Sequence, residues 1–318
     1  MMIEDLFENE IVKLAEQPKN NNLSVDRLNY LNLLIIPIDH DYPGGSAAMH
    51  NAVFERYGLP YRTVFVVADP KNVEMIIKTF RNDPKYIGGG VGSGFKDKAA
   101  KYVDELSDSA KVLESINVIQ KIGRRLIGYN TDGIGFVNGL SKEYPDCVKG
   151  KNILILGAGG TTLPIAYELA MLKPREIVIL NRTVEKAERV SKIISQYVKA
   201  RCGGEEMIER EMPGADIVIN TSNKGAGELK EFTAFAAISD NHMRIARENL
   251  RRLGKNAIVA DILLEEETAT LREAKKMQFR THNGRLMNLF QAIPAFKLMT
   301  GITDISDKHL EEIMRSAL

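Results

Sequence analysis

The sequence has little of what a metal centre, a disulfide framework or a membrane span requires. It contains 2 cysteines and 5 histidines in 318 residues, and neither type shows a metal-ligand spacing such as HExxH. We therefore expect no metal and no disulfide framework, and so few cysteines suit a reducing cytoplasm. The apolar run at 31–38 is far shorter than a membrane span, and the acidic N-terminal stretch is not typical of a signal peptide.

An excess of charge of one sign is also missing. The 43 Lys and Arg residues nearly balance the 42 Asp and Glu residues, which leaves a net charge of +1. This value gives no electrostatic reason to expect a nucleic acid or an anionic membrane as partner. With 44% hydrophobic and 27% charged residues, a chain of this length can bury the cores of two ordinary domains. We expect a cytoplasmic protein that binds small molecules, with a homodimer left open.

One stretch in the middle of the chain predicts a nucleotide site. An apolar strand at 153–156 is followed by the turn Gly157-Ala158-Gly159-Gly160 and by a helical pattern that continues to Leu172. Strand, glycine turn and helix in this order are typical of a dinucleotide site, because the glycines and the helix N-terminus let backbone N–H groups approach a pyrophosphate. Thr162 stands at the third fingerprint position, where a small residue suffices. The alternative is a glycine turn that serves tight packing alone.

The end of the next strand predicts which nucleotide binds. The strand at 176–180 runs into Asn181-Arg182-Thr183, where an NAD site would carry an acidic residue for the ribose 2′-hydroxyl. No carboxylate repels a 2′-phosphate here, and the Arg182 guanidinium can bind one through charge-assisted hydrogen bonds. We therefore predict NADP as the cofactor; the alternative is that Arg182 is only a surface charge.

The chain alternates strands and helices twice, which predicts an α/β protein with two domains. We expect domains at 1–135 and 136–285, with the helices of 286–318 returning to the first domain. The expected strands are 31–38, 61–67, 86–90, 115–120, 125–129, 153–156, 176–180, 216–220, 257–262 and 277–281. The expected helices are 3–16, 51–57, 72–80, 98–106, 132–140, 161–172, 244–253, 286–299 and 307–317.

Lys96 and Asp132 are candidates for proton transfer. Lys96 ends a glycine-rich loop, and Asp132 lies at a predicted turn into a helix. A lysine and a carboxylate that face one site can move the hydroxyl proton while hydride passes to or from a nicotinamide. Spacing alone leaves the simpler interpretations open, namely a solvated lysine and an aspartate that only caps a helix.

Several motifs together resemble the shikimate dehydrogenase family over nearly the whole chain. The most specific is Gly128-Tyr-Asn-Thr-Asp132-Gly-Ile-Gly135, which is similar to the family pattern Gly-x-Asn-Thr-Asp-x-x-Gly. The others, in chain order, are Pro37-Ile38-Asp39-His40 with Ser46-Ala-Ala-Met-His50-Asn51, Val91-Gly-Ser-Gly-Phe-Lys96, Asn117, Gly157-Ala-Gly-Gly160 with Asn181-Arg-Thr183, Asn220-Thr-Ser-Asn-Lys-Gly225 and Gly284-Arg-Leu-Met287-Asn-Leu-Phe-Gln291.

The resemblance implies a fold, a reaction and a set of site residues. The fold would be an N-terminal α/β substrate-binding domain and a C-terminal Rossmann NADP-binding domain with a cleft between them. The reaction would be the NADP-linked interconversion of a cyclic hydroxy acid and its ketone, in the shikimate pathway of aromatic amino acid biosynthesis. Lys96 and Asp132 would be catalytic. The implied binding residues are Ser46, Asn117 and Gln291 for substrate, and Thr221 and Met287 beside the cofactor.

The departures from the family pattern concern the substrate. The family holds the substrate carboxylate with paired serines, of which only Ser46 aligns, and Asp41 adds an acidic side chain nearby. Gly92 and Gly94 replace the family's Thr and Pro, which removes a hydroxyl donor and adds backbone freedom. We expect Arg285 and Lys224 to be exposed, and either of them could bind an anion. Two alternatives therefore stay open: the same scaffold with an amino or other polar substrate, in which Asp41 pairs with an ammonium group, and a sensor without catalysis.

Overall fold

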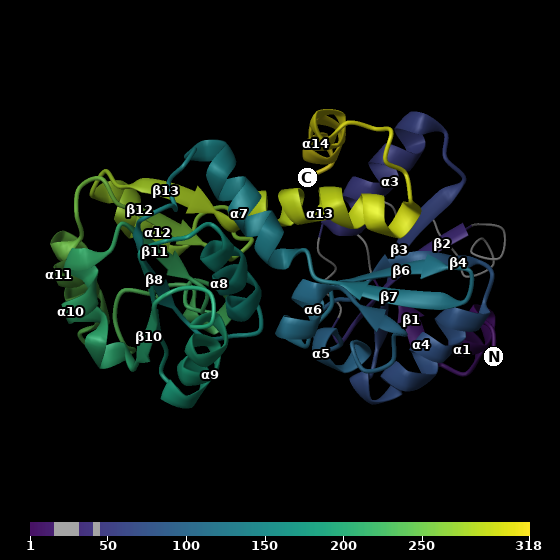
Figure 1. The fold of residues 1–318 in the computed structure, drawn as a ribbon, viewed down its shortest axis with the longest axis horizontal. Coiled ribbons are helices and arrows are strands. Elements are labelled where there is room, and N and C mark those ends of the chain that lie inside the picture. Colours follow the sequence, from purple (N-terminus) through teal and green to yellow (C-terminus); the bar gives the residue numbers. More distant parts are fainter. Residues whose placement is uncertain (16–31, 41–44) are drawn as a thin grey trace. The chain divides into compact units, whose positions relative to one another are not determined.

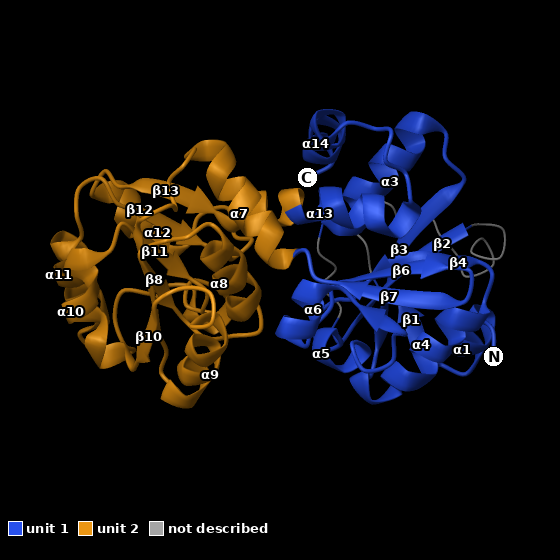
Figure 2. Cartoon of the chain, in the orientation of Figure 1, with its two compact units in different colours: residues 1–131, 291–318 blue, residues 132–290 orange. Residues whose placement is uncertain are grey.

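The computed structural model describes residues 1–15, 32–40 and 45–318, which form two compact units (Figure 2). Unit 1 comprises residues 1–131 and 291–318, and unit 2 comprises residues 132–290. Each unit contains its own β-sheet with helices on both faces (Figure 1). The predicted α/β class with two domains is confirmed.

Unit 1 is built on a seven-stranded sheet of mixed direction. The strands are β1 (Val12–Leu14), β2 (Asn32–Ile38), β3 (Tyr61–Ala68), β4 (Tyr86–Gly90), β5 (Glu105–Leu106), β6 (Val118–Ile122) and β7 (Arg125–Tyr129), in the order β1-β3-β2-β4-β6-β7-β5. β2 is parallel to both β3 and β4, whereas β1 and β6 run antiparallel to their neighbours β3 and β4. β6 and β7 form the predicted strand pair around Gly123, whose φ of 62° suits the turn between them.

Helices cover both faces of this sheet (Figure 1). They are α1 (Ile3–Glu8), α3 (Ser46–Tyr57), α4 (Val73–Asn82), α5 (Lys96–Ala99), α6 (Asp108–Leu113), the second part of α13 (Gly284–Thr300) and α14 (Asp307–Ser316). Alternate residues of β2 face opposite ways, as the two-residue period of a strand requires. Leu33 and Ile35 pack in the cluster that includes α1 and α4, and Ile36 and Ile38 pack in the cluster that includes α3.

Two predicted helices of unit 1 are wrong. The expected helix at 3–16 ends at Glu8, and Val12–Leu14 forms β1 instead, because its backbone pairs with the edge of β3. The expected helix at 98–106 is replaced by the four-residue α5, and Glu105–Leu106 joins the sheet beside β7. In both places tertiary pairing overrides a short helical pattern.

Unit 2 is built on a six-stranded parallel sheet. The strands are β8 (Asn152–Leu156), β9 (Glu176–Leu180), β10 (Ala200–Gly203), β11 (Ile217–Asn220), β12 (Ile258–Asp261) and β13 (Arg280–Asn283), in the order β10-β9-β8-β11-β12-β13. All five pairings are parallel. The chain leaves β8 toward β9 and later returns to β11 on the other side of β8. This doubly wound arrangement places ligands beyond the carboxyl end of β8.

Helices also cover both faces of the second sheet. They are α7 (Asp132–Glu143), α8 (Thr162–Met171), α9 (Val184–Ile194), α10 (Ile208–Glu211), α11 (His242–Arg252), α12 (Ala269–Lys276) and the start of α13. Ile153 and Ile155 pack with α7, α8 and α9, whereas Leu154 and Leu156 pack with α11 and α12. Sequence patterns missed α9, β10 and α12, and the last strand lies at 280–283 instead of 277–281.

Candidate active site

Unit 1 brings its candidate residues to one edge of its sheet. β2, β3 and β4 are parallel, so their carboxyl ends lie together, and the chain crosses from β3 on one side of β2 to β4 on the other. In open α/β sheets such a switch point is where ligands bind. Lys96 follows β4 and begins α5, and Ser46 begins α3 after β2. The antiparallel β6 adds Asn117, which immediately precedes it, at the same edge.

Three predicted substrate residues from distant parts of the chain form one hydrogen-bond network. Gln291 Nε2 donates to Ser46 Oγ at 3.4 Å, although the two residues are 245 positions apart. Asn117 Nδ2 donates to Gln291 Oε1 at 3.4 Å. These side chains come from the start of α3, the start of β6 and the middle of α13. Bonds of this length are weak, so a substrate hydroxyl can replace them at little cost.

Thr131 belongs to the same network and was not predicted as a site residue. Its backbone N–H donates to Asn117 Oδ1 at 2.8 Å, and its hydroxyl lies 3.4 Å from Gln291 Oε1. Asn117 Nδ2 also donates to Thr131 Oγ1 at 3.0 Å. The signal was present, because Thr131 is the central residue of the Asn-Thr-Asp motif. The buried Asn117 amide is therefore held by Thr131, and the Gln291 amide lies 3.4 Å from polar atoms of Ser46, Asn117 and Thr131.

The two candidate catalytic residues stand at helix N-termini. Lys96 is the first residue of α5 and is half-buried, and its carbonyl accepts a hydrogen bond from Ile116 N at 3.0 Å. Asp132 is the first residue of α7 and is buried.

α7 is fixed at both ends within unit 2. Near its start, a Cβ on Gly133 would lie 2.2 Å from the carbonyl oxygen of Pro164, so only glycine allows α7 to approach α8 this closely. At its end, Glu143 Oε2 lies 2.6 Å from Nδ1 of the buried His282 of β13. Burial lowers the pKa of His282. These contacts determine where α7 starts and hence where Asp132 lies.

The loop before Lys96 needs its glycines for close packing as well as for backbone conformation. A Cβ on Gly92 would lie 2.3 Å from Ile38 Cγ2, and a Cβ on Gly94 would lie 2.3 Å from Asp39 Oδ2. Gly94 also has a φ of 75°, which a proline cannot adopt. The loop is therefore packed directly against the end of β2. Asp41, the other acidic residue of the altered segment, lies outside the described residues.

The predicted cofactor residues surround the carboxyl end of β8. Gly157 has a φ of 121°, and a Cβ there would lie 2.7 Å from the backbone of Thr221 and Ser222. By contrast, a Cβ on Gly160 would meet no described atom within 4 Å, and one on Gly159 only Thr221 O at 3.6 Å. Gly157 is thus required by the fold, whereas Gly159 and Gly160 leave an open approach to the backbone, as a phosphate requires.

The Asn181 side chain joins the glycine turn to the end of β9. Its Oδ1 accepts from Ala158 N at 3.0 Å, and its Nδ2 donates to Thr183 O at 2.8 Å. Arg182 and Thr183 are exposed next to it. Among the residues that the structure describes, Arg182 has no acidic partner. This exposed cation beside the turn, with no carboxylate at 181–183, fits a 2′-phosphate.

The remaining predicted residues of unit 2 are buried. Thr162 Oγ1 donates to Thr221 Oγ1 at 2.8 Å, which ties the start of α8 to the loop after β11. Met287 is part of the hydrophobic core of unit 2. The expected exposure of Lys224 is wrong: its Nζ is buried and donates to Glu205 Oε1 and Ala236 O, both at 2.6 Å. Lys224 therefore forms a buried ion pair with Glu205, and its ammonium group is not available to bind an anion.

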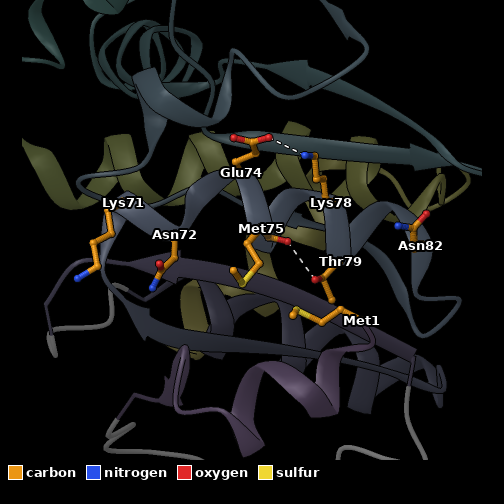
Figure 3. Close-up of a pocket in the computed structure, with 8 residues that line it drawn as sticks. All are labelled: Met1, Lys71, Asn72, Glu74, Met75, Lys78, Thr79 and Asn82. Carbon is orange, nitrogen blue, oxygen red and sulfur yellow. Dashed lines mark hydrogen bonds and ion pairs between the residues drawn. The ribbon is translucent and has the colours of Figure 1, made fainter.

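A groove elsewhere in unit 1 contains none of the predicted site residues. It has a volume of about 440 Å³ and is lined mainly by α4 and the N-terminus (Figure 3). Its lining residues are Met1, Lys71, Asn72, Glu74, Met75, Lys78, Thr79 and Asn82. Across the described ranges, no three His, Cys, Asp or Glu residues are grouped to hold a metal ion. Nor does any helix within those ranges have the length and apolar character to cross a membrane.

Comparison with known proteins identifies the family. The sequence matches a family profile described as the shikimate dehydrogenase substrate binding domain at residues 37–119, and one described as shikimate / quinate 5-dehydrogenase at residues 140–264. A shikimate dehydrogenase (NADP+) of Methanocaldococcus jannaschii is 36% identical over 272 residues, which cover 84% of this chain and 89% of that protein. The chain belongs to the shikimate dehydrogenase family.

Other members agree in sequence and fold. A shikimate dehydrogenase (NADP+) of Pyrococcus abyssi is 33% identical over 267 residues, 84% of this chain and 90% of that one. A solved shikimate dehydrogenase in complex with NADP+ is 30% identical, with a TM-score of 0.77 over 95% of this chain and 98% of that chain. A shikimate 5-dehydrogenase of Listeria monocytogenes shares the fold at a TM-score of 0.78 and 24% identity, over 94% of this chain and 100% of that chain. The resemblance drawn from the motifs is confirmed.

Proposed function

We propose that this protein is an NADP-dependent dehydrogenase that interconverts shikimate, or a closely related cyclic hydroxy acid, and its ketone. The observation that carries the proposal is the Ser46–Asn117–Gln291 network, which joins three family motifs at the ligand-binding edge of unit 1. The relatives named above as shikimate dehydrogenases (NADP+) support the same reaction. Hydroxyl and amide side chains in this arrangement suit a substrate with several hydroxyl groups.

We assign the two units different ligands. Residues 1–135 would bind substrate together with Gln291 from the C-terminal helices of 286–318, and residues 136–285 would bind NADP. The open backbone at Gly159 and Gly160 supports pyrophosphate binding, and the exposed Arg182 beside Asn181 and Thr183 supports binding of the 2′-phosphate. Thr221 and Met287 are assigned to the nicotinamide end. The bound cofactor would supply the hydride acceptor.

In the proposed mechanism Lys96 takes the proton of the reacting hydroxyl as the alcohol is oxidised, and returns it in the reverse direction. Asp132 holds the ammonium group that Lys96 becomes when it takes this proton, and binds a substrate hydroxyl. Asn117 and Gln291 bind further ring hydroxyls, and Ser46 binds the substrate carboxylate. General acid–base groups of this kind contribute about 10²- to 10⁴-fold to a rate. We place the protein in the cytoplasm, where its two cysteines stay reduced, and assign it no nucleic-acid partner.

A second candidate is the same reaction on another small polar substrate. Gly92 offers no hydroxyl, and the Asp39 carboxylate lies against the loop that carries Lys96. A 5-ketofructose reductase of Gluconobacter has this fold with a TM-score of 0.74 and 23% identity, over 91% of this chain and 99% of that chain. The scaffold is thus compatible with more than one substrate. A sensor without catalysis is disfavoured, because pure binding needs neither Lys96 nor Asp132.

The test is formation of reduced nicotinamide, measured by absorbance, with shikimate, quinate and a panel of small polyols and amino alcohols. Each substrate is offered with NADP and with NAD. We expect turnover of shikimate with NADP and a much higher KM for NAD. Turnover only of a panel compound without a carboxylate would support the second candidate, and no turnover of any compound despite NADP binding would contradict both.

A further inference from the structure

The carboxyl end of β2 carries an acid–imidazole pair. Asp39 Oδ1 lies 2.6 Å from His40 Nδ1, directly after the last residue of the strand. The His40 side chain is 56% exposed and the Asp39 side chain 33%, so the ring is accessible while the carboxylate is partly covered. When the imidazole is protonated, Nδ1–H donates to Asp39 and Nε2–H remains for a second acceptor.

Asp39 is built into the loop that carries Lys96. Its carboxylate fills the space that a side chain at Gly94 would occupy, with Oδ2 only 2.3 Å from the position of a Cβ there. Gly94 lies two residues before Lys96. Asp39 and Gly94 therefore depend on each other: a proline or alanine at 94 excludes this Asp39 position. Asp39 is therefore packed against the loop before Lys96.

The surroundings favour an ionised Asp39. The hydrogen bond from His40 is the main reason that the pKa of Asp39 is lowered, and a hydrogen bond from the Ser93 hydroxyl adds to it. The loop from Gly92 to Phe95 contributes no charge. α5 contributes Lys96 and Lys98, and Lys98 Nζ donates to Gly94 O at 3.1 Å. An anionic ligand at this edge would lie near these lysines, and the Asp39 carboxylate is paired with His40.

The family resemblance leaves one role unfilled. Gly92 stands where the family has threonine, and Ser46 is the only one of the paired serines that aligns. Compared with the family pattern, this part of the chain has lost a threonine hydroxyl and one of the two serines that hold the substrate carboxylate. His40 follows β2 at the ligand-binding switch point between β2 and β4, at the same edge as Ser46 and Lys96.

We propose that His40, held in place by Asp39, binds the carboxylate of the substrate and determines the preference for acids over neutral analogues. The inference rests on the proposed function, and it names the side chain that recognises the substrate carboxylate. When the imidazole is protonated, its Nε2–H donates to a carboxylate oxygen, and Asp39 acts through His40 by fixing the ring. A charge-assisted hydrogen bond of this kind is stronger than one from a neutral hydroxyl.

The experiment compares shikimate with methyl shikimate, which lacks the negative charge. kcat/KM is measured for both compounds with NADP in the wild type, His40→Gln and Asp39→Asn. Asp69→Asn is the matched control, because Asp69 follows the neighbouring strand β3, is 50% exposed and pairs with Lys71 at 2.8 Å. The ratio of the two kcat/KM values isolates the carboxylate, since a general disturbance of the loop lowers both.

We expect His40→Gln to lower the preference for shikimate about 10- to 100-fold, with turnover of the methyl ester little changed. Asp39→Asn should lower it by a smaller factor, and Asp69→Asn should leave it unchanged. An unchanged preference in His40→Gln, with shikimate turned over by the wild type, would overturn this inference alone. If the wild type turns over neither compound, the proposed function fails and this inference fails with it.

Discussion

Asn117 and Gln291 belong to one network, but the fold depends on them unequally. Asn117 is buried, and its Oδ1 is the acceptor for Thr131 N at 2.8 Å. Gln291 is half-buried, and its described contacts are 3.4 Å long. A substitution at Asn117 leaves a buried N–H without its partner, which costs about 1–3 kcal/mol. A substitution at Gln291 removes weak contacts of 3.4 Å to Ser46, Asn117 and Thr131.

We therefore predict that Gln291→Ala raises KM for shikimate about tenfold and hardly changes the melting temperature, the lost hydroxyl contact being worth about 1 kcal/mol. Asn117→Ala should raise KM and also lower the melting temperature by several degrees. Steady-state kinetics and thermal denaturation measure the two effects separately. Equal losses of stability in the two variants would show that this division between binding and folding is wrong.

Arg182 gives a prediction about the cofactor. Because it is exposed beside Asn181 and lacks an acidic partner among the described residues, its charge is available for a 2′-phosphate. Arg182→Gln should raise KM for NADP about 10- to 100-fold and leave KM for NAD nearly unchanged. Lys192→Gln, at the exposed last turn of α9, is the control for a simple change of net charge. Parallel increases for NADP and NAD would contradict the assignment.

Individual residues were predictable where a motif names them. Ser46, Asn117 and Gln291 were found through the resemblance, and the structure brings them together. Thr131 was missed, although it lies inside the most specific motif. Lys224 was expected at the surface but is buried, because its partners Glu205 and Ala236 lie 19 and 12 positions away and no local pattern reveals them.

At the scale of elements, the packing of α3 against α13 and β3 gives a pH-dependent prediction. His50 of α3 is fully buried, with the Phe296 ring of α13 at 6.1 Å, and burial lowers its pKa to about 4. Its unfolded-state pKa is about 6.5. Above that pH His50 is neutral in both states and adds no pH dependence. As pH falls from about 6.5 to about 4, the unfolded state takes up a proton that the folded state resists, so stability is lost.

We predict that the wild type loses up to about 3 kcal/mol across this range through His50 and that His50→Met loses correspondingly less. Methionine is apolar and of similar size, so it fills the site without a titrating group. Urea denaturation at a series of pH values measures the difference, and comparison of the two proteins cancels the contributions of His242 and His282. Identical pH profiles would rule out a buried neutral His50.

Strands with strong apolar patterns were the most predictable elements. β3, β8 and β9 lie within one residue of their expected bounds, because a strand buried on both faces leaves a short apolar run in the sequence. β1 and β5 were not predictable. They have three and two residues, and each forms only because a neighbouring strand offers an unpaired edge. The expected helices at 3–16 and 98–106 failed for that reason.

At the scale of the whole molecule, each of the two sheets carries its own set of candidate site residues. The first sheet carries Ser46, Lys96 and Asn117 at a single edge, and the second carries the glycine turn and Asn181 at the carboxyl ends of β8 and β9. The alternation of strands and helices predicted two α/β domains, each with its own sheet. The orders β1-β3-β2-β4-β6-β7-β5 and β10-β9-β8-β11-β12-β13 could not be read from it, because pairing between distant strands leaves no local mark in the sequence.

The central claim is that Lys96 carries the proton in an NADP-linked oxidation of shikimate, and kcat of Lys96→Ala tests it most directly. The control is Lys101→Ala, which removes an exposed lysine just beyond α5. Binding of NADP is measured on the same samples. We predict that Lys96→Ala lowers kcat about 10²- to 10⁴-fold with NADP binding unchanged, while Lys101→Ala behaves as the wild type. A Lys96→Ala variant that keeps kcat within about threefold of the wild type would contradict the account, since general acid–base catalysis is worth far more.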